Sequence, residues 1–197
     1  KLQQDGAGLR AEAALPFTLA FDTSKLTWEL AFFQSEFLLA YRHVALAPAA
    51  AEALREEFSK IAEELAAEPR VLCHRDYHSR NLMVHRNRLV VIDFQDALVG
   101  HPAYDLVSLL QDARRDVSES VERAMLGRYR AACDPGPDFE ADYARLGAQR
   151  NAKIVGIFTR LWKRDGKARY LSMIPRVWAA MERDLAHEAM HPVADWF

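Results

Sequence analysis

The sequence predicts an α+β fold that is mostly helical, with a small β element near its centre. Three observations lead to this fold class. Apolar residues recur at steps of three and four over most of the chain, which indicates amphipathic helices. Between residues 71 and 94 this period gives way to short, partly β-branched apolar runs separated by polar turns, which indicates strands. With 197 residues and a hydrophobic content of 50%, the chain is long enough for one well-buried core.

The first half of the chain predicts a connecting segment and two helices. Residues 1–22 contain two glycines and one proline and show no clean period, so we expect a linker there. The apolar spacing then predicts an amphipathic helix over residues 24–44, with residues 22–24 available as its cap. A second helix begins at Pro48, because proline fits the first helical turn, and ends at the Glu-Pro pair 68–69.

The centre of the chain predicts strands over residues 71–73, 82–84 and 89–94. The polar turn HRNR separates the last two runs, so we expect them to pair as a hairpin. After Gly100 and Pro102 the helical period returns. The predicted helices cover residues 103–113, 118–132, 138–163 and 175–189.

Composition excludes several classes of function. The formal net charge of -2 and the pI near 6.4 give no overall basic field, so binding to nucleic acid or to an anionic membrane is not expected. Cys73 and Cys133 form no CxxC pair, which fits a reducing compartment. The most apolar stretch, residues 28–46, carries three charged residues, so a membrane span is not expected either. We therefore predict a cytoplasmic protein.

Two acidic motifs flank the predicted hairpin: HRDYHSRN at residues 74–81 and IDFQDA at residues 92–97. In the first, Asp76 can accept the proton of a hydroxyl group, and Asn81 can hold a divalent ion. In the second, Asp93 supplies the main ligand for magnesium that bridges phosphates. If the hairpin forms, Asn81 and Asp93 return to the same side, where two oxygen ligands can converge on one hard cation.

The combination of HRDxxxxN with a strand ending in IDF resembles the protein-kinase-like phosphotransferases, and most closely their aminoglycoside phosphotransferase and choline kinase branch. HPAYDLVSLL at residues 101–110 is similar to the helix start that follows the metal-binding Asp in this branch. Few residues separate Asp93 from Pro102, which favours a small-molecule acceptor over a protein. Over residues 20–115 the chain looks most like bacterial kinases that phosphorylate N-acetylmuramate and N-acetylglucosamine at the anomeric hydroxyl.

The resemblance implies the C-terminal lobe of a protein-kinase-like fold, with the hairpin beside the catalytic loop, and ATP and Mg²⁺ as cofactors. Asp76 would deprotonate the acceptor hydroxyl, and Asn81 and Asp93 would hold the metal. His74 would fix the loop by packing, and Asp105 would accept hydrogen bonds from it.

The same resemblance leaves three residues as candidates for binding the acceptor: His78, Arg80 and Asp96. For His78, substrate contact and a merely local hydrogen bond are equally open. Asp96 could instead cap the following turn or bind a second ion. The sequence departs from protein kinases at His78, where they usually have Lys, and at Gln95, which replaces the glycine of DFG.

The resemblance also implies an N-terminal lobe, and the sequence shows none of the motifs expected of it. No lysine lies in a VAIK-like strand before the loop, and Gly6-x-Gly8 follows no strand pattern. We therefore expect residues 1–22 to be a linker from a missing N-terminal lobe and residues 23–197 to be the C-terminal lobe. By itself, this chain is expected not to turn over ATP efficiently.

A transition-metal site is a second interpretation of the same loop, with the ligands Cys73, His74, Asp76 and His78. Residues 74 and 78 would face together only on a helix, and Arg75 and Arg80 would bring positive charge close to a cation. We favour the phosphotransferase interpretation and regard Cys73 as a small buried hydrophobic residue.

The C-terminal helices carry basic residues that could meet a phosphate or a substrate carboxylate, although a solvated helical face is favoured. These residues are Arg150, Lys153, Arg160, Lys163, Arg164, Lys167, Arg169 and Arg176. Trp162 and Trp178 could stack on a sugar, but their helical spacing favours a place in the core.

Two further functions stay open. An aminoglycoside or choline-type kinase would need an acidic acceptor patch, whereas the C-terminal helices are basic. A non-catalytic kinase-like binding module is favoured by the absent lobe and disfavoured by the intact set of Asp76, Asn81 and Asp93.

Overall fold

The computed structural model describes residues 3, 5–6, 19–67, 70–194 and 196. It divides into two compact units, which we describe separately. Unit 1 comprises Lys1–Phe21 and Glu68–Glu140, and unit 2 comprises Asp22–Ala67 and Ala141–Phe197. Most of the predicted linker, including residues 7–18, and the predicted helix end at residues 68–69 lie outside the described residues.

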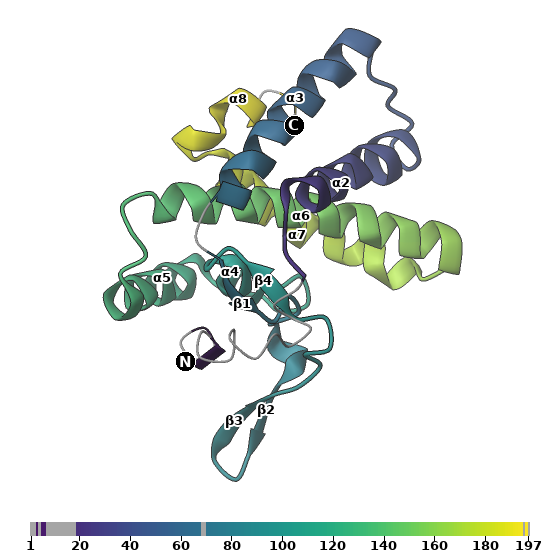
Figure 1. Cartoon of the computed structure of the whole chain (residues 1–197). Helices are drawn as coiled ribbons and strands as arrows, with labels where there is room; N and C mark the ends of the chain where they lie inside the picture. Colours follow the sequence, from purple (N-terminus) through teal and green to yellow (C-terminus); the bar gives the residue numbers. More distant parts are fainter. Residues whose placement is uncertain (1–2, 4, 7–18, 68–69, 195, 197) are drawn as a thin grey trace. The chain divides into compact units, whose positions relative to one another are not determined.

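The described part of unit 1 contains two small antiparallel sheets (Figure 1). In one, β2 (Leu82–His85) pairs with β3 (Arg88–Val91), which confirms the predicted hairpin. In the other, β1 (Val71–Cys73) pairs with β4 (Leu98–Gly100). The predicted single strand pair was therefore incomplete, because β4 was missed and the third strand ends at Val91 rather than at Phe94.

The helices of unit 1 follow the sheets in sequence. The 3₁₀ turn η4 covers Ser79–Asn81, α4 covers Tyr104–Leu110, and α5 covers Glu119–Cys133. Ser118 caps α5 by accepting a hydrogen bond from the amide of Val121, as expected for a serine before a helix. The predicted helices in this part of the chain are thereby confirmed, and α4 ends a few residues earlier than its apolar pattern.

Helices make up the regular structure of the described part of unit 2. Asp22 caps the first helix by accepting a hydrogen bond from the amide of Lys25 at 2.8 Å, which confirms the predicted start. The elements are α2 (Thr23–Phe33), the π-helix η3 (Gln34–Leu39), α3 (Pro48–Ala67), α6 (Phe139–Asp165, whose first two residues belong to unit 1), η5 (Ala168–Met173), α7 (Ile174–Leu185), η6 (Glu188–Met190) and α8 (His191–Ala194).

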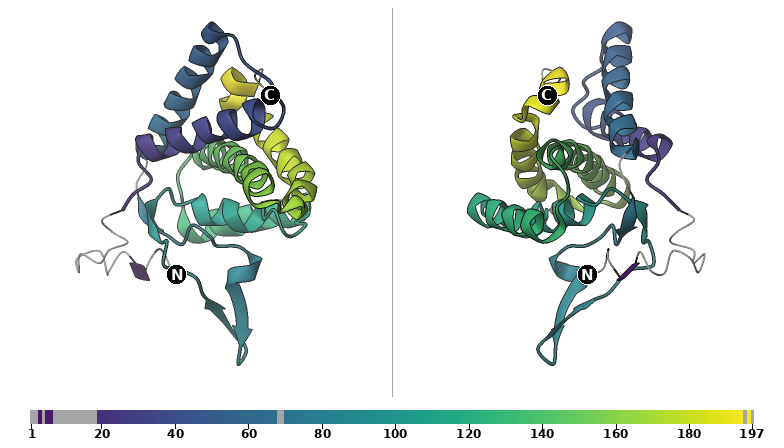
Figure 2. Two further views of the ribbon diagram at one scale, coloured as in Figure 1. Left: turned by 90° about the vertical axis from the view of Figure 1, so that its right-hand side faces the viewer. Right: turned by 60° about the vertical axis from the view of Figure 1, so that its left-hand side comes forward.

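Helices α6 and α7 lie side by side in unit 2 (Figure 2). Gly147 of α6 makes their close approach possible, because a Cβ atom at this position would lie 2.3 Å from Oδ2 of Asp184. The Asp184 carboxylate is buried, and its Oδ2 accepts a hydrogen bond from Nδ2 of Asn151 at 3.3 Å. A side chain at residue 147 would push this carboxylate away from its partner.

The predicted basic face of α6 and α7 is only partly solvated. Arg150 is buried, and Lys153 forms an ion pair of 2.6 Å with the buried carboxylate of Glu29. The interpretation as a solvated face is wrong for these two residues, since both point into the packing of unit 2. The other predicted basic residues, Arg160, Lys163, Arg164, Lys167, Arg169 and Arg176, are exposed.

The two tryptophans take different places. The Trp178 side chain is half-buried and its ring lies 5.5 Å from that of Phe37, whereas Trp162 keeps 37% of its surface exposed beside Tyr41. The predicted position in the core therefore fits Trp178 better than it fits Trp162. In the part of the chain that the structure describes, no helix combines the length and apolar character needed to cross a membrane.

Candidate active site

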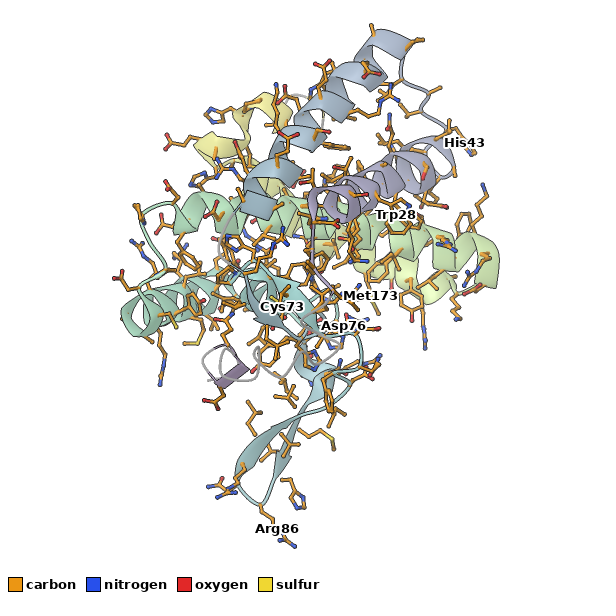
Figure 3. The ribbon with its side chains drawn as sticks, viewed as in Figure 1. Trp28, His43, Cys73, Asp76, Arg86 and Met173 are labelled. Carbon is orange, nitrogen blue, oxygen red and sulfur yellow. The ribbon has the colours of Figure 1, made fainter. Side chains whose placement is uncertain are left out.

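The segment between β1 and β2, residues 74–81, forms a loop that carries most of the predicted site residues. In Figure 3, Cys73 marks the end of β1 and Asp76 lies in the loop just beyond it, while Arg86 marks the far tip of the hairpin. The Asp76 side chain is exposed and Asn81 is buried. The loop thus exposes the Asp76 carboxylate to solvent, whereas the Asn81 side chain at its other end is buried.

Two residues of the site have a left-handed backbone although neither is glycine. The φ angle is 72° at Arg75 and 69° at Asp93. Such conformations cost on the order of 1–3 kcal/mol each and persist only where surrounding contacts fix them. Arg75 precedes the predicted catalytic base, Asp76, and Asp93 is itself a predicted metal ligand, so the strained backbone lies at the predicted site, where it is commonly found.

The carboxylate of Asp105, in the first turn of α4, fixes the start of the loop. It accepts hydrogen bonds from the backbone amides of His74 at 2.7 Å and Arg75 at 3.0 Å. The hydroxyl of Ser108, one turn further along α4, donates to the carbonyl of Arg75 at 3.1 Å. Because these bonds bracket the left-handed residue Arg75, they hold the backbone that turns Asp76 outward.

His74 links the loop to the segment after β3. Its side chain is buried, and Nε2 lies 2.8 Å from the carbonyl oxygen of Ile92. A carbonyl can only accept, so Nε2 carries the proton in this contact. The His74 ring also meets the Tyr77 ring edge-on, with centroids 5.9 Å apart. His74 thereby ties the loop to the residue just before Asp93.

Asn81 and Asp93 lie together at the base of the hairpin. Nδ2 of Asn81 donates to the carbonyl of Asp76 at 2.9 Å and lies 3.4 Å from Oδ2 of Asp93. The amide of Ile92 donates to the carbonyl of Asn81 at 3.0 Å, which continues the hairpin pairing to this point. Both contacts use the donor Nδ2, and Oδ1, which carries the lone pairs, is the atom of the Asn81 side chain that can hold a cation. The Asn81 amide oxygen and the Asp93 carboxylate are the kinds of oxygen donor that suit a hard divalent ion such as Mg²⁺.

The three candidates for acceptor binding differ in exposure. Arg80 and Asp96 are exposed, while His78 is buried and its amide donates to the carbonyl of Asp76 at 2.9 Å. Asp96 meets the loop through its carbonyl, which lies 3.4 Å from the guanidinium of Arg75. Burial of His78 favours the local-contact alternative for that residue, and acceptor binding by all three stays a prediction.

The transition-metal interpretation gains no support from the structure. Cys73 is fully buried, and burial raises the pKa of its thiol well above the usual value. The thiolate that a metal requires is therefore disfavoured. Across the described ranges, no group of three or more His, Cys, Asp or Glu residues is placed to hold a metal ion. A magnesium site does not need such a cluster, because phosphates and water supply further oxygens.

The sequence analysis missed two residues that contact the loop: Ser108 in α4, and Asp112, which follows α4. The Asp112 carboxylate accepts hydrogen bonds from the amide of Ser79 at 3.1 Å and from the hydroxyl of Ser79 at 2.6 Å. Their spacing gave a signal for both, because Asp105, Ser108 and Asp112 are three and four apart within the helix predicted over residues 103–113. Side chains at this spacing lie on one side of a helix.

Residues 6–147, more than half of the chain, match the phosphotransferase enzyme family. Three curated relatives, each named N-acetylmuramate/N-acetylglucosamine kinase, are similar to this chain. The protein from Caulobacter vibrioides is 38% identical over 204 residues, covering 94% of this chain and 55% of the relative. The one from Neisseria meningitidis serogroup B is 47% identical over 120 residues, covering 57% and 36%. The one from Pseudomonas aeruginosa is 36% identical over 176 residues, covering 85% and 52%. The chain thus spans about half the length of these relatives or less.

Proposed function

The chain belongs to the phosphotransferase enzyme family, and from this premise we propose that the whole protein is an amino-sugar kinase. It would transfer the γ-phosphoryl group of ATP to a hydroxyl of N-acetylmuramate or N-acetylglucosamine. The observation that carries the proposal is the convergence of Asn81 and Asp93 beside the loop that presents Asp76. The names of the curated relatives support the choice of acceptor.

Asp76 is the proposed catalytic base. Its carboxylate is exposed, whereas the neighbouring backbone is fixed by Asp105 and Ser108. A carboxylate held in this way can accept a hydrogen bond from the acceptor hydroxyl and orient its oxygen for attack. It can then take the proton as the new oxygen–phosphorus bond forms. The rigid loop supplies the positioning on which phosphoryl transfer mainly depends.

Asn81 and Asp93 are the proposed magnesium ligands. When bound, the ion would neutralise negative charge on the nucleotide phosphates. On this chain, Asp93 offers a carboxylate and Asn81 its Oδ1, which the bond from Nδ2 to the Asp76 carbonyl orients. The same bond ties the metal ligands to the backbone of the proposed base. The proposed base and one proposed metal ligand are therefore carried by the same loop.

The rest of the protein is proposed to provide what this chain lacks. Residues 23–197 would form the C-terminal lobe, and residues 1–22 would lead from an N-terminal lobe that covers the phosphates and supplies a lysine for them. The predicted cytoplasmic location suits this activity, because ATP is the phosphoryl donor. The proposed partners are thus the nucleotide, a small-molecule acceptor and the N-terminal lobe.

The test is phosphoryl transfer from ATP by the full-length protein, with N-acetylmuramate, N-acetylglucosamine, an aminoglycoside and choline offered separately. We expect transfer to the two amino sugars, with the phosphate at the anomeric carbon as read by phosphorus–proton coupling in NMR. Transfer only to the aminoglycoside or to choline would replace the proposed acceptor by the corresponding alternative. No transfer, together with no Mg²⁺-dependent binding of ATP, would favour a non-catalytic binding module.

A further inference from the structure

The 74–81 loop is attached at both ends to one short segment of the chain, which we call the loop anchor: Asp105, Ser108 and Asp112. Asp105 and Ser108 hold the start of the loop through the backbone of His74 and Arg75. Asp112 holds it near its end through two bonds to Ser79. The proposed base, residue 76, lies between these two attachments.

The second attachment lies where the 3₁₀ turn η4 begins. This turn covers Ser79–Asn81, and the side chain of its N-cap residue, His78, makes no capping hydrogen bond. The first amides of any helical turn have no partner inside the turn and need one elsewhere. Asp112 supplies that partner from 33 residues away in sequence, with a carboxylate that suits the positive end of the peptide dipoles. It therefore takes the place of a local N-cap for the turn that carries Asn81.

The Asp112 carboxylate is itself well fixed. It is buried, with 3% of the residue exposed, and its Oδ1 accepts a further hydrogen bond from the amide of Arg114 at 2.9 Å. Burial by itself would raise the pKa of Asp112, but the bonds from Ser79 and Arg114 and the neighbouring His78 hold this pKa below its usual value. The group is thus a carboxylate at neutral pH, and it accepts from both donors of Ser79 at once.

We propose that Asp112 is a positioning residue that sets the place of the magnesium ligand Asn81 by fixing Ser79. The path from Asp112 to the metal site is short. Ser79 begins the turn, the amide of Asn81 donates to the carbonyl of His78 at 2.9 Å, and the Asn81 side chain bridges the Asp76 carbonyl and Asp93. Release of Ser79 leaves the turn without its cap, so Asn81 loses its fixed distance from Asp93. This role rests on the proposed function of Asn81 and Asp93.

The first experiment measures Mg²⁺-dependent ATP binding and phosphoryl transfer by the full-length protein carrying Asp112→Asn. We expect the Mg²⁺ concentration for half-maximal ATP binding to rise about tenfold and kcat to fall about tenfold, as for other partners that orient metal ligands. The KM for the amino sugar should stay within about a factor of two of the wild-type value, because the acceptor is not held by Asn81. An unchanged Mg²⁺ requirement overturns the proposal, whatever happens to kcat.

Three further variants separate positioning from general damage. Ser79→Ala should shift the Mg²⁺ requirement in the same direction but less, because the amide of residue 79 remains as a donor. Ser79→Thr, which keeps the hydroxyl, should restore the wild-type requirement. In the double variant with Asp112→Asn, Ser79→Ala should add no further shift, whereas additive shifts would show that the two residues act separately. Asp138→Asn, at an exposed aspartate of the same unit, is the matched control and should change nothing.

A second experiment needs neither nucleotide nor acceptor. Hydrogen exchange of the Ser79 amide in the full-length protein should become at least about tenfold faster in Asp112→Ala, because this variant removes the carboxylate that accepts from the amide, and an amide loses protection when its acceptor is lost. The amide of Val107 in α4 should keep its rate. If the wild-type protein fails to phosphorylate amino sugars but still binds ATP with Mg²⁺, only the acceptor assignment fails. If Ser79 exchange is unchanged in the variant, Asp112 does not fix the turn and the proposal falls.

Discussion

Both units of the protein bury carboxylates, but they use them differently. In unit 1, Asp105 and Asp112 accept hydrogen bonds from the backbone amides of the 74–81 loop. In unit 2, Glu29 accepts from the side chains of Gln149 at 2.9 Å and Lys153 at 2.6 Å. The first arrangement fixes a loop in a strained conformation and leaves Asp76 exposed. The second links two helices, α2 and α6, and its carboxylate, Glu29, is buried.

The difference shows how burial of similar groups can serve function or stability. A carboxylate that satisfies backbone amides replaces the pairing that regular secondary structure would provide, so the loop can remain irregular. A carboxylate that pairs with a lysine across two helices makes those helices depend on each other. Substitution of the carboxylate that the loop exposes, Asp76, should therefore affect mainly turnover, and substitution in the Glu29 pair should affect mainly the free energy of unfolding.

The largest expected effect is the loss of turnover on substitution of Asp76, which should leave the free energy of unfolding almost unchanged. Asp76→Asn in the full-length protein should lower kcat by about 10²- to 10⁴-fold, because it removes a general base without changing the shape of the side chain. Since Asp76 is exposed, the free energy of unfolding should change by less than about 0.5 kcal/mol. Turnover assays, ATP-binding titrations and urea denaturation measure the three quantities. A comparable loss of ATP affinity would remove the proposed role in chemistry.

In unit 2, the matched substitution is Lys153→Met. It leaves the buried Glu29 carboxylate without its cation, so the free energy of unfolding should fall by about 3 kcal/mol. Lys60→Met is the control, because Lys60 pairs with Glu57 on the exposed surface of α3 and such pairs contribute little. Urea denaturation of both variants makes the comparison. Equal, small losses would show that the Glu29 pair is no more important to stability than a surface pair.

Substitution of two helical glycines by alanine should change the free energy of unfolding by smaller amounts, with opposite signs in the two units. Gly147→Ala should destabilise unit 2 by about 1–2 kcal/mol, because its Cβ atom would collide with the Asp184 carboxylate, and the gain in helix propensity does not offset this. Gly127→Ala in α5 of unit 1 should instead stabilise by about 1 kcal/mol, since nothing lies within 4 Å of the added atom. Thermal or urea unfolding of the two variants measures both changes in stability. Stabilisation by Gly147→Ala would mean that Asp184 moves aside freely.

The sequence predicted features that depend on local patterns. The helix starts at Asp22 and Pro48 follow from capping preferences, and the hairpin follows from two apolar runs with a short polar turn. Because a hairpin returns the chain to its starting point, the approach of Asn81 to Asp93 could also be expected. The residues proposed for the chemistry are therefore the ones that the sequence already pointed to.

Features that depend on distant contacts or on backbone strain were not predicted. Strand β4 has three residues, too few for a period, and pairs with β1 across more than twenty intervening residues. The π-helix η3 continues an apolar pattern that also fits an α-helix. The left-handed conformations of Arg75 and Asp93 occur without glycine; aspartate is enriched at such angles, but one aspartate among many does not mark the position, and arginine gives no signal. The spacing of Asp112 from Asp105 and Ser108 was a signal for it, but its partner, Ser79, can be identified only once the loop and α4 have been placed side by side.

The smallest expected effect is the pH dependence of the Asp112 attachment. Because its pKa is lowered in the folded protein, its stabilising contribution is present above the unfolded pKa of about 3.9 and is lost as the pH falls through the folded value. The difference in unfolding free energy between wild type and Asp112→Asn should therefore be constant from pH 7 to pH 5 and shrink below pH 4. Asp138→Asn should follow the wild-type curve throughout. A difference that stays constant down to pH 3 would mean that the folded protein does not favour the ionised carboxylate, and that Ser79 is held equally well by a neutral group.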